Sequence, residues 1–145
     1  MNFMMAQVIT NNSFNTSRSI SMAGATVSGP GTVESVFYNP ANLSNLSGSS
    51  FLIGSTMFYE QQNLEYQFAA LSFKLDSKNI MAVTVQRLGV NASGYSNELS
   101  SENSISFSQG FHLRKDRNSS FSIGYNLNYF ILSQGNSAGS AGDGS

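Results

Sequence analysis

Apolar and polar residues alternate along two segments in the second half of the chain, residues 104–113 and 120–131. A period of two is typical of β-strands, in which successive side chains point to opposite faces of the sheet. The polar residue Gln109 lies on the predicted apolar face. The other residues of this face are Ile105, Phe107, Phe111, Leu113, Phe121, Ile123, Tyr125, Leu127, Tyr129 and Ile131. The predicted polar face holds Ser104, Ser106, Ser108, Gly110, His112, Ser120, Ser122, Gly124, Asn126 and Asn128.

Three further strands are predicted earlier in the chain, over residues 51–59, 64–75 and 79–88. In the second of them the apolar residues change face near Ala69 and Ala70. This change predicts a β-bulge, because one extra residue in a strand reverses its two faces. The fold class is therefore predicted to be all-β, with about five antiparallel strands.

A different pattern precedes the strands, at residues 35–43 with the sequence SVFYNPANL. Asn39 can cap a short helical turn through its side-chain oxygen, and Pro40 fits the first helical position, which needs no N–H donor. An ordinary surface turn at Asn-Pro is the alternative interpretation. Residues 29–31, Gly-Pro-Gly, predict a further turn. A nucleotide-binding loop is disfavoured here, because the Gly spacing differs and no Gly-Lys-Ser/Thr follows.

The composition argues against several function classes. The chain of 145 residues has a net charge of −1 and only 10% charged residues, compared with about 25% in soluble domains. No basic stripe indicates nucleic-acid binding, and the absence of cysteine excludes disulfide and thiolate chemistry. His112, the only histidine, lacks an orienting partner within a motif, and no His/Cys cluster predicts a zinc site. We therefore predict no enzymatic activity, no cofactor and no metal.

The predicted strands suit both a transmembrane β-barrel and a soluble β-domain rich in Asn and Ser. Their length of about 9–11 residues is what a tilted strand needs to cross a bilayer. Short connections at residues 76–78 and 115–117 alternate with long ones at 89–103 and 134–145, as in bacterial outer-membrane barrels. The polar face favours the barrel, because it carries Ser, Asn and Gly rather than the Lys, Glu and Thr of a water-exposed sheet.

The barrel hypothesis assigns the two faces of the last strands to different environments. The predicted lumen-facing residues are Ser104, Ser106, Ser108, His112, Ser122, Asn126 and Asn128. The predicted lipid-facing residues are Phe107, Phe111, Phe121, Ile123, Tyr125, Leu127 and Tyr129. Outer-membrane lipid is therefore an expected partner, and nucleic acid is not.

Five strands are too few to close such a barrel, because bacterial single-chain barrels have an even number of at least about 8. An open edge in lipid would leave unpaired backbone groups. We therefore expect the chain to be an N-terminal fragment, with a small curved sheet domain as the alternative. The expected division is a signal-peptide remnant or extended N-terminus over residues 1–17, a separate segment over 18–47, and the first barrel strands over 48–145.

Two stretches resemble a known family of outer-membrane proteins. Residues 18–25, RSISMAGA, and residues 34–43, ESVFYNPANL, are similar to the start of the FadL-type transporters of long-chain fatty acids and hydrocarbons. They are closer still to the PorV/PorQ-like proteins of type IX secretion, in which Arg and a Met-Gly-Gly-Ala-like element precede an acidic residue and Asn-Pro-Ala-Gly-Leu. Residues 116–129 continue the likeness. The chain departs from the pattern at Ala23, Asn42 and the Gly-Pro-Gly insertion.

The resemblance implies a 14-stranded bacterial outer-membrane barrel whose lumen holds residues 18–46 as a hatch. Its implied hatch motif is Arg18, Gly24, Glu34, Asn39, Pro40 and Ala41, with Arg18 and Glu34 paired. The implied function is transport of a hydrophobic small molecule past the hatch. The alternatives are a PorV-like role in protein secretion and cargo shuttling, with secretion-system proteins as partners, and a soluble or surface structural β-domain.

Overall fold

A computed structural model describes residues 16–23, 25–27, 31–57, 64–76, 78–91 and 98–134. Within these residues the chain forms one antiparallel sheet in the order β1-β2-β3-β4-β5. The strands are β1 Ser50–Met57, β2 Leu64–Asp76, β3 Asn79–Asn91, β4 Glu98–Lys115 and β5 Ser120–Gln134. The all-β class and the five antiparallel strands are thereby confirmed. Gly24, residues 29 and 30 of the predicted Gly-Pro-Gly turn, and residues 1–15 of the predicted N-terminal segment 1–17 lie outside the described residues.

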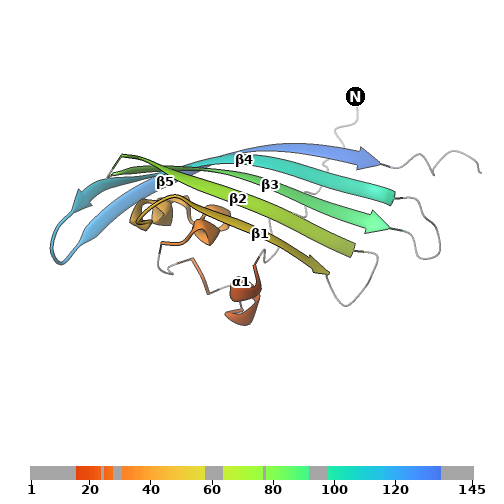
Figure 1. Ribbon diagram of the computed structural model, residues 1–145, viewed down its shortest axis with the longest axis horizontal. Helices are drawn as coiled ribbons and strands as arrows, with labels where there is room; N and C mark the ends of the chain where they lie inside the picture. Colours follow the sequence, from red (N-terminus) through yellow and green to blue (C-terminus); the bar gives the residue numbers. More distant parts are fainter. Residues whose placement is uncertain are drawn as a thin grey trace, which may run out of the picture.

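In the described residues, three short helical elements precede the sheet: α1 Ser17–Ser21 and the 3-10 helices η2 Val33–Phe37 and η3 Pro40–Asn45. Figure 1 shows the sheet curving over η2 and η3, while α1 lies farther from the strands. We call residues 31–46 the helical segment, the sheet face that it contacts the inner face, and the opposite face the outer face.

The inner face carries most of the buried residues, and they change character across the sheet. Its buried members are Tyr66, Phe68, Ala70, Ser72, Ile80, Ala82, Thr84, Gln86, Leu88, Glu102, Ser104, Ser106, Ser108 and His112. On β2 and β3 these side chains are mainly apolar and pack against Val33, Val36 and Leu43 of the helical segment. On β4 they are mainly hydroxyl groups. The core therefore lies between the helical segment and the first half of the sheet.

The second part of the core is aromatic. Tyr66, Phe68 and Leu88 form a buried cluster next to Phe37 of η2. The rings of Phe37 and Phe68 meet edge to face, with centroids 5.7 Å apart, a favoured geometry for aromatic pairs. The Tyr66 hydroxyl donates a hydrogen bond to Gln86 Oε1 at 2.7 Å, so that this buried phenol has a polar partner.

The β-bulge predicted near Ala69 and Ala70 is wrong. The pairing of β2 with β1 and with β3 is regular through these residues, and a register shift occurs only farther along, between Lys74 and Asp76. The apolar residues change face along β2 without a bulge. In the first half of the strand Gln67 points outward and Phe68 inward, whereas in the second half Leu71 points outward and Ser72 inward. Ala70 is buried in the core, whereas Leu71 points outward and is half exposed.

Two tight turns lie at one end of the sheet and join β2 to β3 and β4 to β5, and the pairing of β3 with β4 completes the order of the last four strands. Between β4 and β5, Asp116 N–H donates to the Ser119 carbonyl at 2.7 Å. The intervening Asp-Arg-Asn-Ser sequence is rich in residues that favour turns. Strands β2 to β5 contain 13, 13, 18 and 15 residues. The predicted range of β2 is correct to one residue. Strands β3, β4 and β5 extend three or more residues farther than predicted at the end away from the tight turns, where the sequence is mostly polar or lacks alternation.

Candidate functional site

The Asn-Pro-Ala motif forms the start of η3, as the sequence pattern predicts. Asn39 Oδ1 accepts a hydrogen bond from the Ala41 N–H at 3.2 Å, and Pro40 occupies the first turn. Asn39 Nδ2 also donates to the Val27 carbonyl at 3.1 Å. The Asn39 side chain therefore caps η3 and also binds the backbone at Val27. The element that it caps is a 3-10 helix of six residues.

Two glycines allow η3 to lie directly against the sheet. Gly110 of β4 and Gly124 of β5 are cross-strand partners on the inner face. A Cβ atom at Gly110 would lie 2.5 Å from the Pro40 oxygen, and one at Gly124 would lie 2.5 Å from the Pro40 carbonyl carbon. Real Cβ atoms do not approach backbone so closely. Glycine is therefore required at both positions for this close approach of two backbones.

Polar side chains beside the glycines connect the helical segment to β4 and β5. The Ser44 and Ser122 hydroxyl oxygens lie 2.9 Å apart, and Ser122 Oγ is 2.8 Å from His112 Nδ1. Asn126 Nδ2 donates to the Val36 carbonyl at 3.2 Å. His112 is thus placed in a chain of hydroxyl groups with no carboxylate among its hydrogen-bond partners in the described part of the protein.

Several buried polar atoms of this inner surface lack a hydrogen-bond partner within the described residues. They are Thr84 Oγ1, Ser104 Oγ, Ser108 Oγ, His112 Nε2 and Asn126 Oδ1. The predicted lumen-facing residues all lie on this face: Ser104, Ser106, Ser108 and His112 are buried, Ser122 and Asn126 are half-buried, and Asn128 is exposed. The inner face of β4 and β5 is therefore small, polar and incompletely hydrogen-bonded.

The predicted pair of Arg18 and Glu34 is wrong for the described structure. Both residues line a small depression together with Tyr38, but no ion pair joins them in the described part of the chain. Arg18 is exposed and Glu34 is half-buried. Both charges keep access to water and need no partner to compensate for desolvation.

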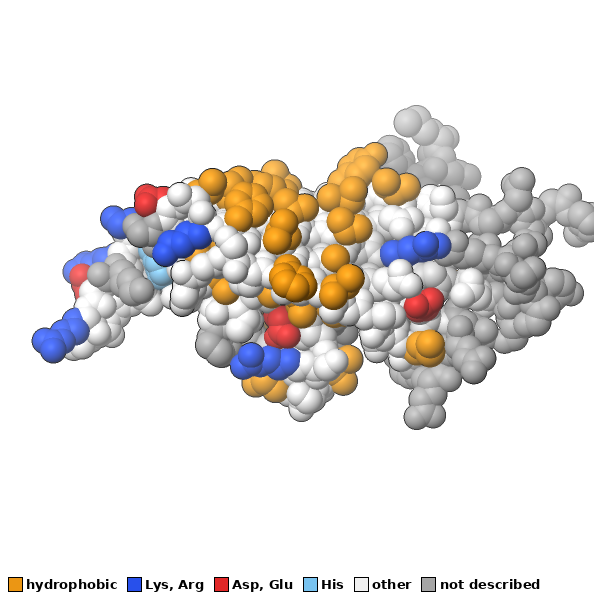
Figure 2. Space-filling model, in the orientation of Figure 1, with side chains coloured by type: hydrophobic (Ala, Val, Ile, Leu, Met, Phe, Trp, Pro, Cys, Tyr) orange, Lys and Arg blue, Asp and Glu red, His pale blue; other side chains and the backbone are white. Residues whose placement is uncertain are grey.

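The outer face is apolar and exposed. Its exposed large side chains include Phe51, Ile53, Leu71, Val85, Ile105, Phe121, Ile123, Tyr125, Leu127, Tyr129 and Ile131. Phe107 and Phe111, also predicted to face lipid, lie on the same face and are half-buried. Figure 2 shows hydrophobic side chains over the middle of the visible face, with Lys and Arg side chains gathered toward the left end, near the tight turns.

The register places the outer side chains in rows across the sheet. One entirely apolar row is Phe51, Leu71, Val83, Phe107 and Leu127, and the next is Ile53, Ala69, Val85, Ile105 and Tyr129. Gln109 interrupts the apolar face, but its amide donates to Asn79 Oδ1 at 2.8 Å and accepts from the Tyr125 hydroxyl at 2.5 Å. This polar group is therefore satisfied within the sheet, which lowers the cost of placing it in an apolar surface.

Neither a helical membrane span nor a metal site is found in the described part. No helix there is long and apolar enough to cross a membrane, and no group of three or more His, Asp or Glu residues there could hold a metal ion.

The sequence pattern identified the polar face but missed the two glycines as contact sites for η3. They are two glycines among thirteen in the chain, and only the register shows that they are adjacent. The site is thus an Asn-capped turn lying on a glycine pair within a polar surface.

Scans of protein-family models, curated proteins and solved structures find no match to this chain.

Proposed function

We propose that the sheet is part of the wall of a FadL-type outer-membrane β-barrel, that the helical segment is its luminal hatch, and that the barrel transports a hydrophobic small molecule. The observation that carries the proposal is the polarity of the two faces. Large apolar residues are exposed on the outer face, whereas Ser104 and Ser108 on the inner face are almost fully buried. A transmembrane barrel has this arrangement, with an apolar exterior and a polar interior.

The dimensions of the apolar surface support the same proposal. On β5 the outward side chains are apolar from Phe121 to Ile131. Ten steps of about 3.4 Å along a strand tilted by about 40° span about 26 Å. The apolar band of outer-membrane barrels is about 25 Å tall. The two free edges of the described sheet, at β1 and β5, would pair with further strands, as a barrel in lipid requires.

The polar contacts of the helical segment with β4 and β5 support a hatch that can move at this end, while Val33, Val36 and Leu43 pack against β2 and β3. Its side-chain bonds to the last two strands, Ser44–Ser122 and Asn126–Val36, use neutral groups that water can replace when the hatch leaves. Neutral hydrogen bonds of this kind contribute only about 0.5–1.5 kcal/mol each. Gly110 and Gly124 position the hatch only because they lack side chains, so that the η3 backbone can lie against the sheet there.

A disulfide between hatch and wall tests the transport function. The Ser44 and Ser122 oxygens are 2.9 Å apart, so cysteines at both positions are expected to bond when oxidised, and the chain has no native cysteine to interfere. We expect cells producing the S44C/S122C protein to lose uptake of a fluorescent long-chain fatty acid, and to regain it on reduction.

Either single-cysteine variant serves as the control and should transport in both redox states. Two results would count against the proposal. Unchanged uptake by the oxidised double variant would contradict hatch movement. Uptake by the unmodified protein no greater than that of cells lacking it would contradict transport of this substrate class.

A further inference from the structure

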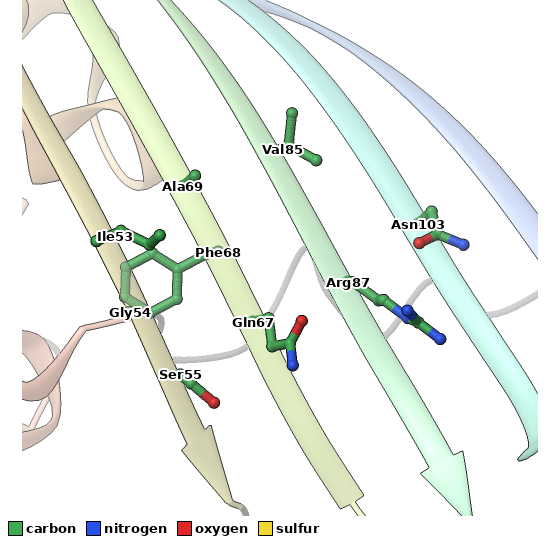
Figure 3. A pocket seen from close by; sticks show the side chains of 9 residues that line it. All are labelled: Ile53, Gly54, Ser55, Gln67, Phe68, Ala69, Val85, Arg87 and Asn103. Carbon is green, nitrogen blue, oxygen red and sulfur yellow. The ribbon is translucent and has the colours of Figure 1, made fainter.

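A broad depression crosses the outer face over β1, β2 and β3 and reaches β4. Its volume is about 540 Å³, within the range of about 300–1,000 Å³ that is usual for small-molecule sites. Figure 3 shows Ile53, Ala69 and Val85 along one side, and Gln67, Arg87 and Asn103 along the other. We call it the outer groove.

The outer groove exists because short side chains lie between longer ones. Ala69 is the middle residue of the apolar row between Ile53 and Val85, and its single methyl group leaves the row open at β2. Ser55 leaves a similar gap at β1 in the next row. The outer groove is therefore lined by apolar side chains along one side and by polar side chains along the other, which we call its polar border.

The polar border carries charges of both signs. Arg87 is exposed on the outer face beside Gln67, its cross-strand partner. Glu65 lies one row beyond, diagonal to Arg87, and its Oε1 accepts from Gln67 Nε2 at 2.9 Å and from Ser55 Oγ at 3.4 Å. Diagonal neighbours on adjacent strands are about 7–8 Å apart. A cation and an anion thus stand side by side at the end of an apolar groove.

We propose that the outer groove binds a phospholipid with a phosphoethanolamine headgroup. Arg87 contacts the phosphate, Glu65 accepts from the ammonium, and an acyl chain lies along Ile53, Ala69 and Val85. A guanidinium matches the geometry of a phosphate oxygen pair. An ammonium adds a positive charge to its hydrogen bond with the neighbouring carboxylate, which the glycerol hydroxyls of phosphatidylglycerol do not. This inference rests on the proposed function, because a bilayer lipid reaches the outer face only if that face lies in a membrane.

Native mass spectrometry tests the lipid site. The protein is released from nanodiscs containing equal amounts of phosphatidylethanolamine and phosphatidylglycerol, and the lipid that stays bound is identified. We expect retention mainly of phosphatidylethanolamine. R87Q should reduce the retention of both lipids about tenfold, which corresponds to the loss of about 1.4 kcal/mol of binding free energy. E65Q should remove the preference between the two lipids. A69L should reduce retention by filling the groove without changing a charge.

Two control variants leave the outer groove unchanged. R114Q removes an exposed arginine near the tight turn, and I123L alters the outer face on β5. Both should retain lipid normally. Equal retention of the two lipids by the unmodified protein, or retention unaffected by R87Q, overturns the lipid site. A protein that enters the nanodisc but fails in this way still has a membrane wall, whereas a protein that does not enter contradicts the proposed function itself.

Discussion

Replacement of Gly124 by leucine is expected to release η3 from the sheet while leaving the strands paired. Even a Cβ atom at this position would lie 2.5 Å from the Pro40 carbonyl carbon, and the remaining leucine atoms need still more space. The obstructing atoms are backbone, which cannot rotate away as a side chain can. The helical segment must therefore move off β5.

Displacement of the helical segment exposes its most deeply buried side chains. Leu43 is 0% exposed and Val36 is 2% exposed, and burial of each such side chain is worth about 1.5–3 kcal/mol. A loss of at least about 3 kcal/mol corresponds to a fall of about a hundredfold in protection from amide hydrogen exchange. Exchange measured by mass spectrometry on peptides covering residues 33–45 should show this fall, with β4 and β5 still protected.

Gly48 supplies the matched control, because a Cβ atom there would meet nothing within 4 Å. Gly48→Leu should leave the protection of residues 33–45 unchanged. Equal protection in Gly124→Leu and Gly48→Leu would show that η3 does not lie on the glycine pair.

Replacement of Leu127 by arginine is expected to cost about 2–4 kcal/mol of folding free energy in lipid vesicles. Leu127 is 63% exposed and ends an apolar row that runs across all five strands. On a soluble domain, a substitution at so exposed a site changes stability by no more than about 0.5 kcal/mol. Near the middle of a bilayer, a lipid-facing arginine costs about 2–4 kcal/mol. The size of the effect therefore separates the two environments.

Urea unfolding of the protein in lipid vesicles measures this cost. Asn128→Arg is the control, because Asn128 is the next residue of the same strand, is also exposed, and points to the inner face. It should shift the unfolding midpoint little. Similar small shifts for both variants would support a soluble sheet domain.

The sequence predicted the central parts of β4 and β5 well, because one face of each strand is apolar there and the other face is polar. From Phe121 to Ile131 the outward residues are apolar and the inward ones are mainly Ser, Gly and Asn. The ends of β4 were missed because residues 98–103 are mostly polar on both faces. A period of two gives no signal where both faces meet a polar environment.

The alternation misled on β2 for a different reason. Tyr66 and Phe68 face the core with η2 in the first half of the strand, whereas Leu71 faces outward in the second half, so that each face is apolar over only part of its length. On β1, Gly54 stands where the ring of Phe68 covers it, which weakened the pattern further. Both departures come from tertiary packing against the helical segment, which the strand sequences alone do not contain.

Local chemistry predicted the Asn39 cap, because the residues involved are adjacent in sequence. The glycine pair and the Ser44–Ser122–His112 chain join residues up to 78 positions apart, and no local pattern predicts such contacts. The Arg18–Glu34 pair came from family resemblance, and here the two charges remain accessible to water.

The central claim is that the outer face meets lipid and the inner face of β5 meets water. Because the chain lacks cysteine, single spin labels can be placed at L127C and N128C in the membrane-inserted protein. We expect the label at position 127 to collide more with oxygen, and the label at position 128 to collide more with a water-soluble nickel chelate. Equal access of the nickel chelate to both labels would contradict it.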